Sequence, residues 1–205
     1  MLFRSDLVGS TALAARHDPE DLHEMLATYQ RQATRLIEAA GGMVARYAGD
    51  GVLAYFGFPS AGEDDAERAV KAGLDLTARI NEGHALSETF TVRVGIATGV
   101  VIVGDLLQSA SADRPPVVGE TPNLAARLQG LAEPGTVVIA SDTRRLVGGL
   151  FEYLPMPLTY LKGYIEPVAA WQVLGESKLA SRFEALRTKG ALVGREPVLD
   201  RKSVV

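Results

Sequence analysis

The hydrophobic positions between residues 19 and 40 recur at the spacing of an α-helix. Asp18 and Pro19 precede them in the order expected for a helix cap and a first helical residue. Gly41-Gly42 follow them, and glycine is common just after a helix end. The pattern therefore predicts one long helix, with a polar face and an apolar face, between these two boundaries.

After this helix the pattern shortens to apolar runs that are typical of strands. The pair Asp50-Gly51 separates two such runs, which predicts a β-hairpin from residues 43–47 and 52–56. Before the long helix, the pattern predicts a strand over 1–6. After the hairpin it predicts a helix over about 64–82, a strand over 89–97 that pairs with a strand over 100–103, and a helix over 120–131. The last elements predicted are a strand over 137–140, a short helix capped by Ser141-Asp142, and a closing antiparallel pair over 151–162 and 168–174.

The order of these elements decides the fold class. It reads β-α-β-β-α-β followed by further helices and strands, which predicts an α+β fold with a ferredoxin-like core and additional αβ elements. A doubly wound parallel sheet would alternate strand and helix throughout, so it is excluded. From about Gly175 the pattern changes to a polar helix and a glycine-containing linker. We expect one domain over 1–174 and a separate segment over 175–205.

Composition narrows the classes of function. The chain has 205 residues, 47% of them hydrophobic, which is enough for one domain with a core. A net charge of −4 gives no positive field for nucleic acid or an anionic membrane, so neither is expected as a partner. The absence of cysteine excludes disulfides and cysteine nucleophiles and fits a cytoplasmic location. No apolar run approaches the roughly 20 residues of a membrane-spanning helix.

Two aspartates are the first candidates for chemistry. Asp6 and Asp50 each lie at a turn beside a strand. If the first strand pairs with the strand reached after the long helix, the two carboxylates converge at one end of the sheet. Carboxylates, with phosphates supplying further oxygens, suit Mg²⁺ or Mn²⁺. The alternative is that Asp50 only forms the hairpin turn and Asp6 only caps the turn that follows it.

Other polar positions have similar alternatives. Successive backbone N–H groups at Gly9-Ser10-Thr11 can hold phosphate oxygens, or form a plain turn. Arg93, within a strand, faces solvent, a carboxylate or an anionic ligand. Asn123 and Arg127 share one helix face, which is ordinary amphipathicity or a clamp for a ribose and a phosphate. No phosphate-binding P-loop and no GxSxG sequence is present.

Taken in order, these fragments resemble the class III adenylate/guanylate cyclase family. The resemblance covers about 1–174, and five fragments carry it: Asp6-Leu7-Val8-Gly9-Ser10-Thr11, Tyr47-Ala48-Gly49-Asp50-Gly51, Val92-Arg93-Val94-Gly95-Ile96-Ala97-Thr98-Gly99, Val118-Gly119-Glu120-Thr121-Pro122-Asn123-Leu124-Ala125-Ala126-Arg127-Leu128 and Leu161-Lys162-Gly163. It implies a nucleoside triphosphate substrate that is converted to a cyclic 3′,5′-monophosphate and pyrophosphate.

The resemblance also implies residue roles. Asp6 and Asp50 match the aspartates that hold two metal ions, and Leu7 matches a position that lends a backbone carbonyl. Asn123 matches the residue that orients the ribose, and Arg127 the residue that stabilises the transition state at the α-phosphate. The remaining substrate contacts implied are Val8, Gly9, Ser10, Thr11, Arg46, Arg93 and Lys162.

In this family the site lies between two catalytic domains, which implies a homodimer. One chain would supply Asp6 and Asp50, and the other Asn123, Arg127 and Lys162. A homodimer would then carry two equivalent sites, as two-fold symmetry requires.

The chain departs from the family at three places. Arg46 stands where the family has a base-reading lysine, and Pro116 stands where its polar partner would be. Adenylate cyclases dominate this branch, so ATP is the expected substrate, with GTP as the alternative. The stretch Phe3-Arg4-Ser5-Asp6 has one residue more than the usual spacing before the aspartate. Residues 191–197 resemble the opening of an AAA-type ATPase domain, which is expected to follow in a longer protein.

A second hypothesis is a cyclase-like module that dimerises without turnover, which Arg46, Pro116 and the altered first strand favour. Intact Asp6 and Asp50, together with Asn123 and Arg127, favour an active enzyme. A diguanylate cyclase of the GGDEF type is not supported, because the hairpin here reads Ala48-Gly49-Asp50-Gly51.

Overall fold

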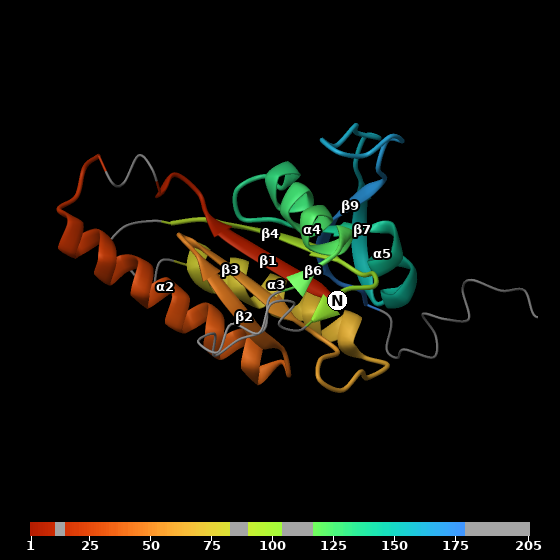
Figure 1. Ribbon diagram of the computed structural model, residues 1–205, viewed down its shortest axis with the longest axis horizontal. Coiled ribbons are helices and arrows are strands. Elements are labelled where there is room, and N and C mark those ends of the chain that lie inside the picture. The colour runs from red at the N-terminus through yellow and green to blue at the C-terminus, as the bar shows by residue number, and fades with distance from the viewer. Residues whose placement is uncertain (11–14, 83–89, 104–116, 179–205) are drawn as a thin grey trace, which may run out of the picture.

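The protein is described by a computed structural model that covers residues 1–10, 15–82, 90–103 and 117–178. Its elements, in chain order (Figure 1), are β1 (Leu2–Leu7), α2 (Pro19–Ala39), β2 (Met43–Ala48), β3 (Gly51–Tyr55), α3 (Asp65–Asn81), β4 (Val92–Ala97), β5 (Ile102–Val103), β6 (Val117–Val118), α4 (Glu120–Leu131), β7 (Val137–Ala140), α5 (Ser141–Val147), β8 (Phe151–Pro155) and β9 (Ala170–Glu176).

The sheet confirms the predicted fold class. Seven strands lie in the order β2-β3-β1-β4-β7-β9-β8. Its first four members, with α2 and α3 between them in sequence, form the expected ferredoxin-like core, and β7, β9 and β8 extend the sheet beyond β4. Strand β1 is antiparallel to both of its neighbours. The first strand of the chain is therefore an interior strand of the sheet.

Two of the predicted strand pairings are wrong. Strand β1 pairs with β3, the second strand of the hairpin, and not with β2, the strand that follows α2. Residues 100–103 were expected to pair with the strand before them, but Ile102–Val103 pairs with Val117–Val118 in a separate two-stranded sheet. Both edges of β4 are already occupied, by β1 and by β7, so β4 has no free edge for a hairpin partner.

Helices cover the two faces of the sheet unequally. Helices α2 and α3 pack on one face, where they form the larger core with alternate side chains of β1, β3 and β4. Helix α4 packs on the other face against a smaller apolar cluster that includes Ala125 and Leu128. The two faces of β1 therefore meet different surroundings: a closed apolar core on one side, and α4 on the other.

Helix α2 begins and ends as the sequence predicts. Pro19 occupies the start of the helix, although the side chain of Asp18 makes no capping hydrogen bond. Met25, Tyr29 and Ala33 lie four residues apart and are buried, which keeps one stripe of this helix against the sheet. None of the helices in the described part of the chain is long and apolar enough to cross a membrane.

The C-terminal part of the domain is less regular than the pattern predicted. The closing pair is continuous only between β8 and β9, and Thr159 and Val168 form one isolated bridge in the connection that joins them. This connection projects from the body of the molecule (Figure 1). Ser141 does not cap α5: it is the first helical residue, and its hydroxyl donates to the carbonyl oxygen of Ala169 at 3.2 Å.

Candidate active site

Asp6 is held near the end of β1 by pairing on both sides. Its partners in register are Gly51 on β3 and Arg93 on β4. Because side chains alternate along a strand, Asp6 and Arg4 share the sheet face that carries α4, whereas Ser5 points to the opposite face. The register runs without a shift from Leu2 to Asp6, so β1 is a regular strand up to the aspartate.

The hairpin turn brings Asp50 beside Asp6. Gly49 adopts a φ of +63°, a conformation that favours glycine, and its carbonyl oxygen accepts a hydrogen bond from Nε2 of Gln30 at 3.1 Å. Gly51 follows the turn, and a Cβ atom there would lie 2.9 Å from a β1 carbonyl oxygen and 3.3 Å from Oδ1 of Asp6. Gly49 therefore permits the conformation of the turn, and Gly51 lets the turn approach β1 closely.

The two carboxyl groups perturb each other. Burial raises the pKa of the Asp6 carboxyl to about 6, and a hydrogen bond to Asp50 and the charge of Asp50 act in the same direction. The Arg4 and Arg93 guanidinium groups oppose this rise in the pKa of Asp6. Paired carboxylates that repel each other are a place where a divalent cation would relieve the repulsion.

The donor set fits a cation that is shared with a substrate. The described residues contain no group of three or more His, Cys, Asp or Glu side chains that could hold a metal ion. Asp6 and Asp50 would therefore need backbone and substrate oxygens to complete the coordination. Mg²⁺ is bound in this way in phosphate-transfer sites, through one or two carboxylates and the phosphates of the substrate.

Behind the site, the opposite face of β1 is fixed by a buried hydrogen bond. The hydroxyls of Ser5 and Tyr29 lie 2.7 Å apart. Burial raises the pKa of the Tyr29 hydroxyl, and the charges of Asp6 and Asp50 raise it further, so it stays neutral. The bond ties α2 to the strand at the residue that precedes Asp6.

Asn123 and Arg127 lie on the outer side of α4. Both are exposed, whereas Ala125, Leu128 and Gln129 on the same helix are buried. An α-helix turns about 100° per residue, so Asn123 and Arg127 are only about 40° apart, and Gln129 lies about 120–160° around the helix from them. Gln129 faces the sheet: its Nε2 donates to Oδ2 of Asp6 at 3.4 Å. Asn123 and Arg127 therefore point away from Asp6 of their own chain.

The turn that follows Leu161 lies beside this outer face of α4. Leu161 is buried and Lys162 is exposed. Burial and the Glu120 carboxylate raise the pKa of the Tyr164 hydroxyl, and the Arg127 guanidinium opposes this rise. The side chains of Tyr164 and Arg127 are thus close enough to interact, which groups the 161–164 turn with α4 and not with the aspartates.

The remaining predicted residues are spread over the same molecule. Val8 and Gly9 form the turn after β1, and Ser10 follows it. The backbone N–H of Val8 donates to the carbonyl oxygen of Thr91 at 2.9 Å. Arg46 is exposed on β2 in register with Leu53. The predictions for Thr11 and Pro116 fall outside the described residues.

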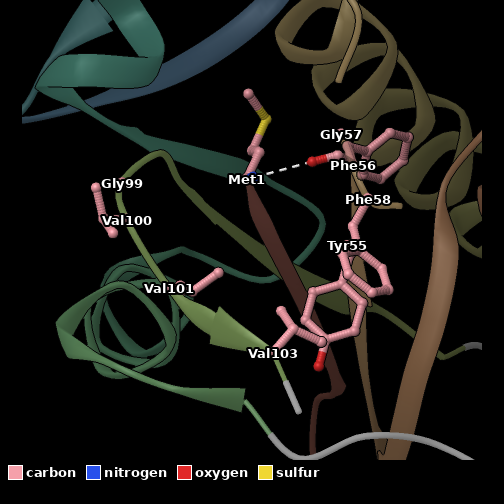
Figure 2. A pocket seen from close by; sticks show the side chains of 9 residues that line it. All are labelled: Met1, Tyr55, Phe56, Gly57, Phe58, Gly99, Val100, Val101 and Val103. Carbon is pink, nitrogen blue, oxygen red and sulfur yellow. Dashed lines mark hydrogen bonds between the residues drawn. The ribbon is translucent and has the colours of Figure 1, made fainter. Parts of the chain in front are cut away.

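A separate cavity lies at the other end of β1. Figure 2 shows it between Met1, the aromatic rings of Tyr55 and Phe58, and the segment that carries Val101 and Val103. Its volume is about 430 Å³, and the amino group of Met1 donates to the carbonyl oxygen of Phe56 at 2.9 Å. No predicted site residue lines it, so this cavity does not belong to the candidate active site.

Comparison with known proteins decides the family. Residues 1–174 match the family model described as the adenylate and guanylate cyclase catalytic domain. The chain belongs to this family. The chain is 34% identical to an uncharacterised protein of Rhizobium meliloti over 198 residues, which are 95% of this chain and 19% of that protein. The chain therefore spans about a fifth of the length of this relative.

Solved structures agree with the assignment. The adenylyl cyclase CyaB from P. aeruginosa superimposes with a TM-score of 0.79 at 26% identity, over 86% of this chain and 94% of that one. The guanylyl cyclase Cya2 superimposes with the same TM-score of 0.79 at 29% identity, over 88% of this chain and 93% of that one. The cyclase domain is thus similar to enzymes named for either nucleotide.

Two side chains at the aspartates were missed by the sequence reasoning. Arg4 lies two residues before Asp6, and strand alternation alone would have placed both on one face. Its Nε, like that of Arg93, is buried without a hydrogen-bond partner in the described part of the chain. Gln129 is a buried polar residue on the apolar stripe of α4. That break in the stripe was visible in the sequence, but its target on β1 was not.

Proposed function

We propose that two copies of this domain form a homodimer that converts ATP to cyclic 3′,5′-AMP and pyrophosphate. The observation that carries the proposal is the division of the site residues within one chain. Asp6 and Asp50 converge on the sheet, whereas Asn123 and Arg127 point away from them on the outer side of α4. A complete site would therefore combine the aspartates of one chain with the α4 face of another.

In this proposal the aspartates bind the triphosphate through divalent cations. Two Mg²⁺ or Mn²⁺ ions held there, with help from the Leu7 carbonyl, would activate the ribose 3′-hydroxyl and neutralise charge on the departing pyrophosphate. Arg93 lies in register with Asp6, so its guanidinium group would bind a phosphate oxygen beside the cations. Backbone N–H groups at Gly9 and Ser10 would contact the same phosphates, whereas the N–H of Val8 is already bonded to the carbonyl oxygen of Thr91.

The partner's α4 face would act on the other side of the substrate. Asn123 would orient the ribose, so that its 3′-oxygen lies in line with the α-phosphorus. Arg127 would stabilise the charge that develops on the α-phosphate in the transition state. Lys162, exposed in the turn beside Arg127, would hold the terminal phosphates. Such a reaction depends mainly on positioning and charge stabilisation, which these side chains supply.

The choice of base is a separate part of the proposal. The similar solved structures include enzymes named for both nucleotides. Arg46, which we propose as the base-reading residue, is a donor only and its planar guanidinium differs in geometry from a lysine ammonium. It would donate to a ring nitrogen of adenine.

The test is nucleotide turnover with purified protein. Wild-type protein and Asp50→Ala are each incubated with ATP or GTP in Mn²⁺ or Mg²⁺, and cyclic nucleotides are quantified. Cyclic AMP that disappears in Asp50→Ala supports the proposal. Cyclic GMP in its place retains the mechanism and overturns the base assignment. No product from either nucleotide, with a dimer measured in solution, would favour the non-catalytic dimerising module.

A further inference from the structure

Gln129 connects α4 to the aspartate cluster. It is 8% exposed and occupies a buried stripe with Thr121, Ala125 and Leu128. Its amide nitrogen donates to Oδ2 of Asp6 at 3.4 Å. The other carboxylate oxygen, Oδ1, faces the hairpin, because the Cβ position at Gly51 lies 3.3 Å from it. The Gln129 amide therefore engages one oxygen and leaves Oδ1 directed toward the Asp50 turn.

Close packing of α4 against β4 sets the position from which the Gln129 amide reaches Asp6. A Cβ atom on Gly95 of β4 would lie 2.3 Å from the carbonyl oxygen of Ala125 and 2.3 Å from the backbone nitrogen of Gln129. The helix backbone thus rests directly on the strand at this glycine. At its N-terminal end, the Thr121 hydroxyl donates to the carbonyl oxygen of Val100 at 3.2 Å. The position of the Gln129 amide is therefore set by backbone packing.

We infer that Gln129 is a positioning residue that fixes the rotation of the Asp6 carboxylate for cation binding and, through α4, links the two active sites of the dimer. The second part rests on the proposed function. Under that proposal, Asn123 and Arg127 serve the site that contains the partner's aspartates, while Gln129 on the same helix holds the aspartate of its own chain. A displacement of α4 at one site then changes the carboxylate at the other.

The physical basis is the loss of orientation when the donor is removed. A half-buried carboxylate near the end of a strand can rotate unless a neighbour holds it. Partners that orient metal ligands change metal affinity by about 10–100-fold. The contact in question is a long hydrogen bond, so we expect the lower end of this range. Leucine at position 129 would fill much of the same volume without a donor, and asparagine would keep the donor on a side chain that is one methylene shorter.

The first experiment measures cation binding without turnover. Binding of Mn²⁺ alone is followed by the electron paramagnetic resonance signal of the free ion, for wild-type protein, Gln129→Leu and Gln129→Asn. We expect the dissociation constant to rise about tenfold in Gln129→Leu. Asparagine keeps the amide donor on a shorter side chain, so Gln129→Asn should recover only part of the loss. Circular dichroism confirms that each variant is folded. Unchanged Mn²⁺ affinity in a folded Gln129→Leu would overturn the positioning role.

The second experiment separates the two sites of the dimer. A mixed dimer of an Asp50→Ala chain and an Arg127→Ala chain, purified through two different tags, holds one complete site. Its aspartates come from the Arg127→Ala chain. Gln129→Leu in that chain should raise the Mn²⁺ concentration for half-maximal activity about tenfold, with little change in the maximal rate at saturating Mn²⁺.

The same substitution in the Asp50→Ala chain is the matched control, because Asp6 of that chain holds no substrate. There the Mn²⁺ requirement should stay the same, and any change should fall on the maximal rate through α4. Equal shifts of the Mn²⁺ requirement from both placements would overturn the inference. If the mixed dimer without Gln129→Leu is inactive while wild-type protein is active, the proposal of a site shared between chains is wrong, and so is the link between sites. Mn²⁺ binding to the Gln129 variants still decides the positioning role.

Discussion

The aspartate cluster and the outer face of α4 differ in how their side chains are held. Asp6 is paired on both sides, lies opposite a glycine that leaves it room, and receives a hydrogen bond from Gln129. Asn123 and Arg127 are exposed on the outer side of a helix. The acidic half of the candidate site, Asp6 and Asp50, is thus held by contacts within the chain. The other half, Asn123 and Arg127, points outward to solvent. This is the arrangement expected of two halves that are completed by different chains.

The largest effect should come from separating these two halves. Asp50→Ala and Arg127→Ala should each reduce cyclase activity by about 10³-fold or more, since each removes charge stabilisation that the other half cannot replace. Mixed in equal amounts and allowed to exchange subunits, they should recover about a quarter of wild-type activity, because half of the dimers then hold one complete site. Cyclic nucleotide production measures the recovery.

Mixing two preparations of Asp50→Ala is the control for this complementation, and it should recover nothing. Activity in either single variant comparable to wild type, or no recovery in the mixture, would contradict a site shared between chains.

The next effect concerns the contact that holds α4 between the two regions. Gly95→Ala places a Cβ atom against the α4 backbone and should destabilise the fold by about 1–3 kcal/mol. Gly130→Ala, on the same helix, meets nothing within 4 Å and should stabilise it by up to about 1 kcal/mol through helix propensity. Urea unfolding measures both. If both variants unfold at the same urea concentration, α4 does not rest on β4 as described.

A smaller effect should come from the support behind Asp6. Tyr29→Phe removes the partner of the buried Ser5 hydroxyl and should cost about 1–2 kcal/mol. Tyr47→Phe is the matched control, since its hydroxyl lies 2.8 Å from that of Thr34 in an exposed position, and it should cost less. Thermal unfolding distinguishes them. Equal losses in the two variants would show that burial of the Ser5–Tyr29 pair contributes nothing.

The smallest effect should come from removing the charge of Asp6, a charge that we expect to lower the stability of the folded protein at neutral pH. The pKa of Asp6 is raised from 3.8 to about 6 in the folded protein, so the folded state favours the protonated carboxyl. The resulting contribution to the free energy of unfolding is fully present below pH 3.8 and is lost as the pH rises through 6. Asp6→Asn should therefore raise the Tm of the metal-free protein at pH 7 by about 1–3 °C.

The pH and the metal are the controls for this variant. The gain in Tm should shrink toward pH 4, where Asp6 of the wild-type protein is itself protonated. Mn²⁺ should raise the Tm of wild-type protein and not that of Asp6→Asn. A variant that is less stable than wild type at pH 7 would contradict the stability cost.

The sequence predicts the elements that depend on local signals, and it fails for pairings that depend on distant parts of the chain. The helices from Pro19 to Ala39 and from Glu120 to Leu131 were found because their periodicity and boundary residues are local signals. The partner of β1 was assigned wrongly, because which strand of a hairpin lies inside a sheet depends on side-chain packing in three dimensions. Residues 100–103 were misassigned for a similar reason: β7, which occupies the second edge of β4, follows much later in the chain.

The site residues divide likewise. Motif resemblance predicted Asp6 and Asp50 as metal ligands. The structure brings the two side chains together, and their role in metal binding stays a prediction. It could not identify Gln129 as a partner of Asp6, because the rotation of α4 relative to the sheet is fixed by the absence of a side chain at Gly95. The prediction of Arg46 as a base-reading residue is untested by the fold of a single chain.

The interior position of β1 also bears on how the chain folds. This strand comes first in the sequence, yet its neighbours begin at residues 51 and 92. Pairings between distant segments must overcome a large loop-closure entropy before they stabilise anything, and chains rich in them fold slowly. During synthesis, one edge of β1 would stay unpaired until β4 has left the ribosome. Asp6, which we propose as a metal ligand, is therefore made before both strands that flank it, and it reaches its final surroundings only after β4 has been made.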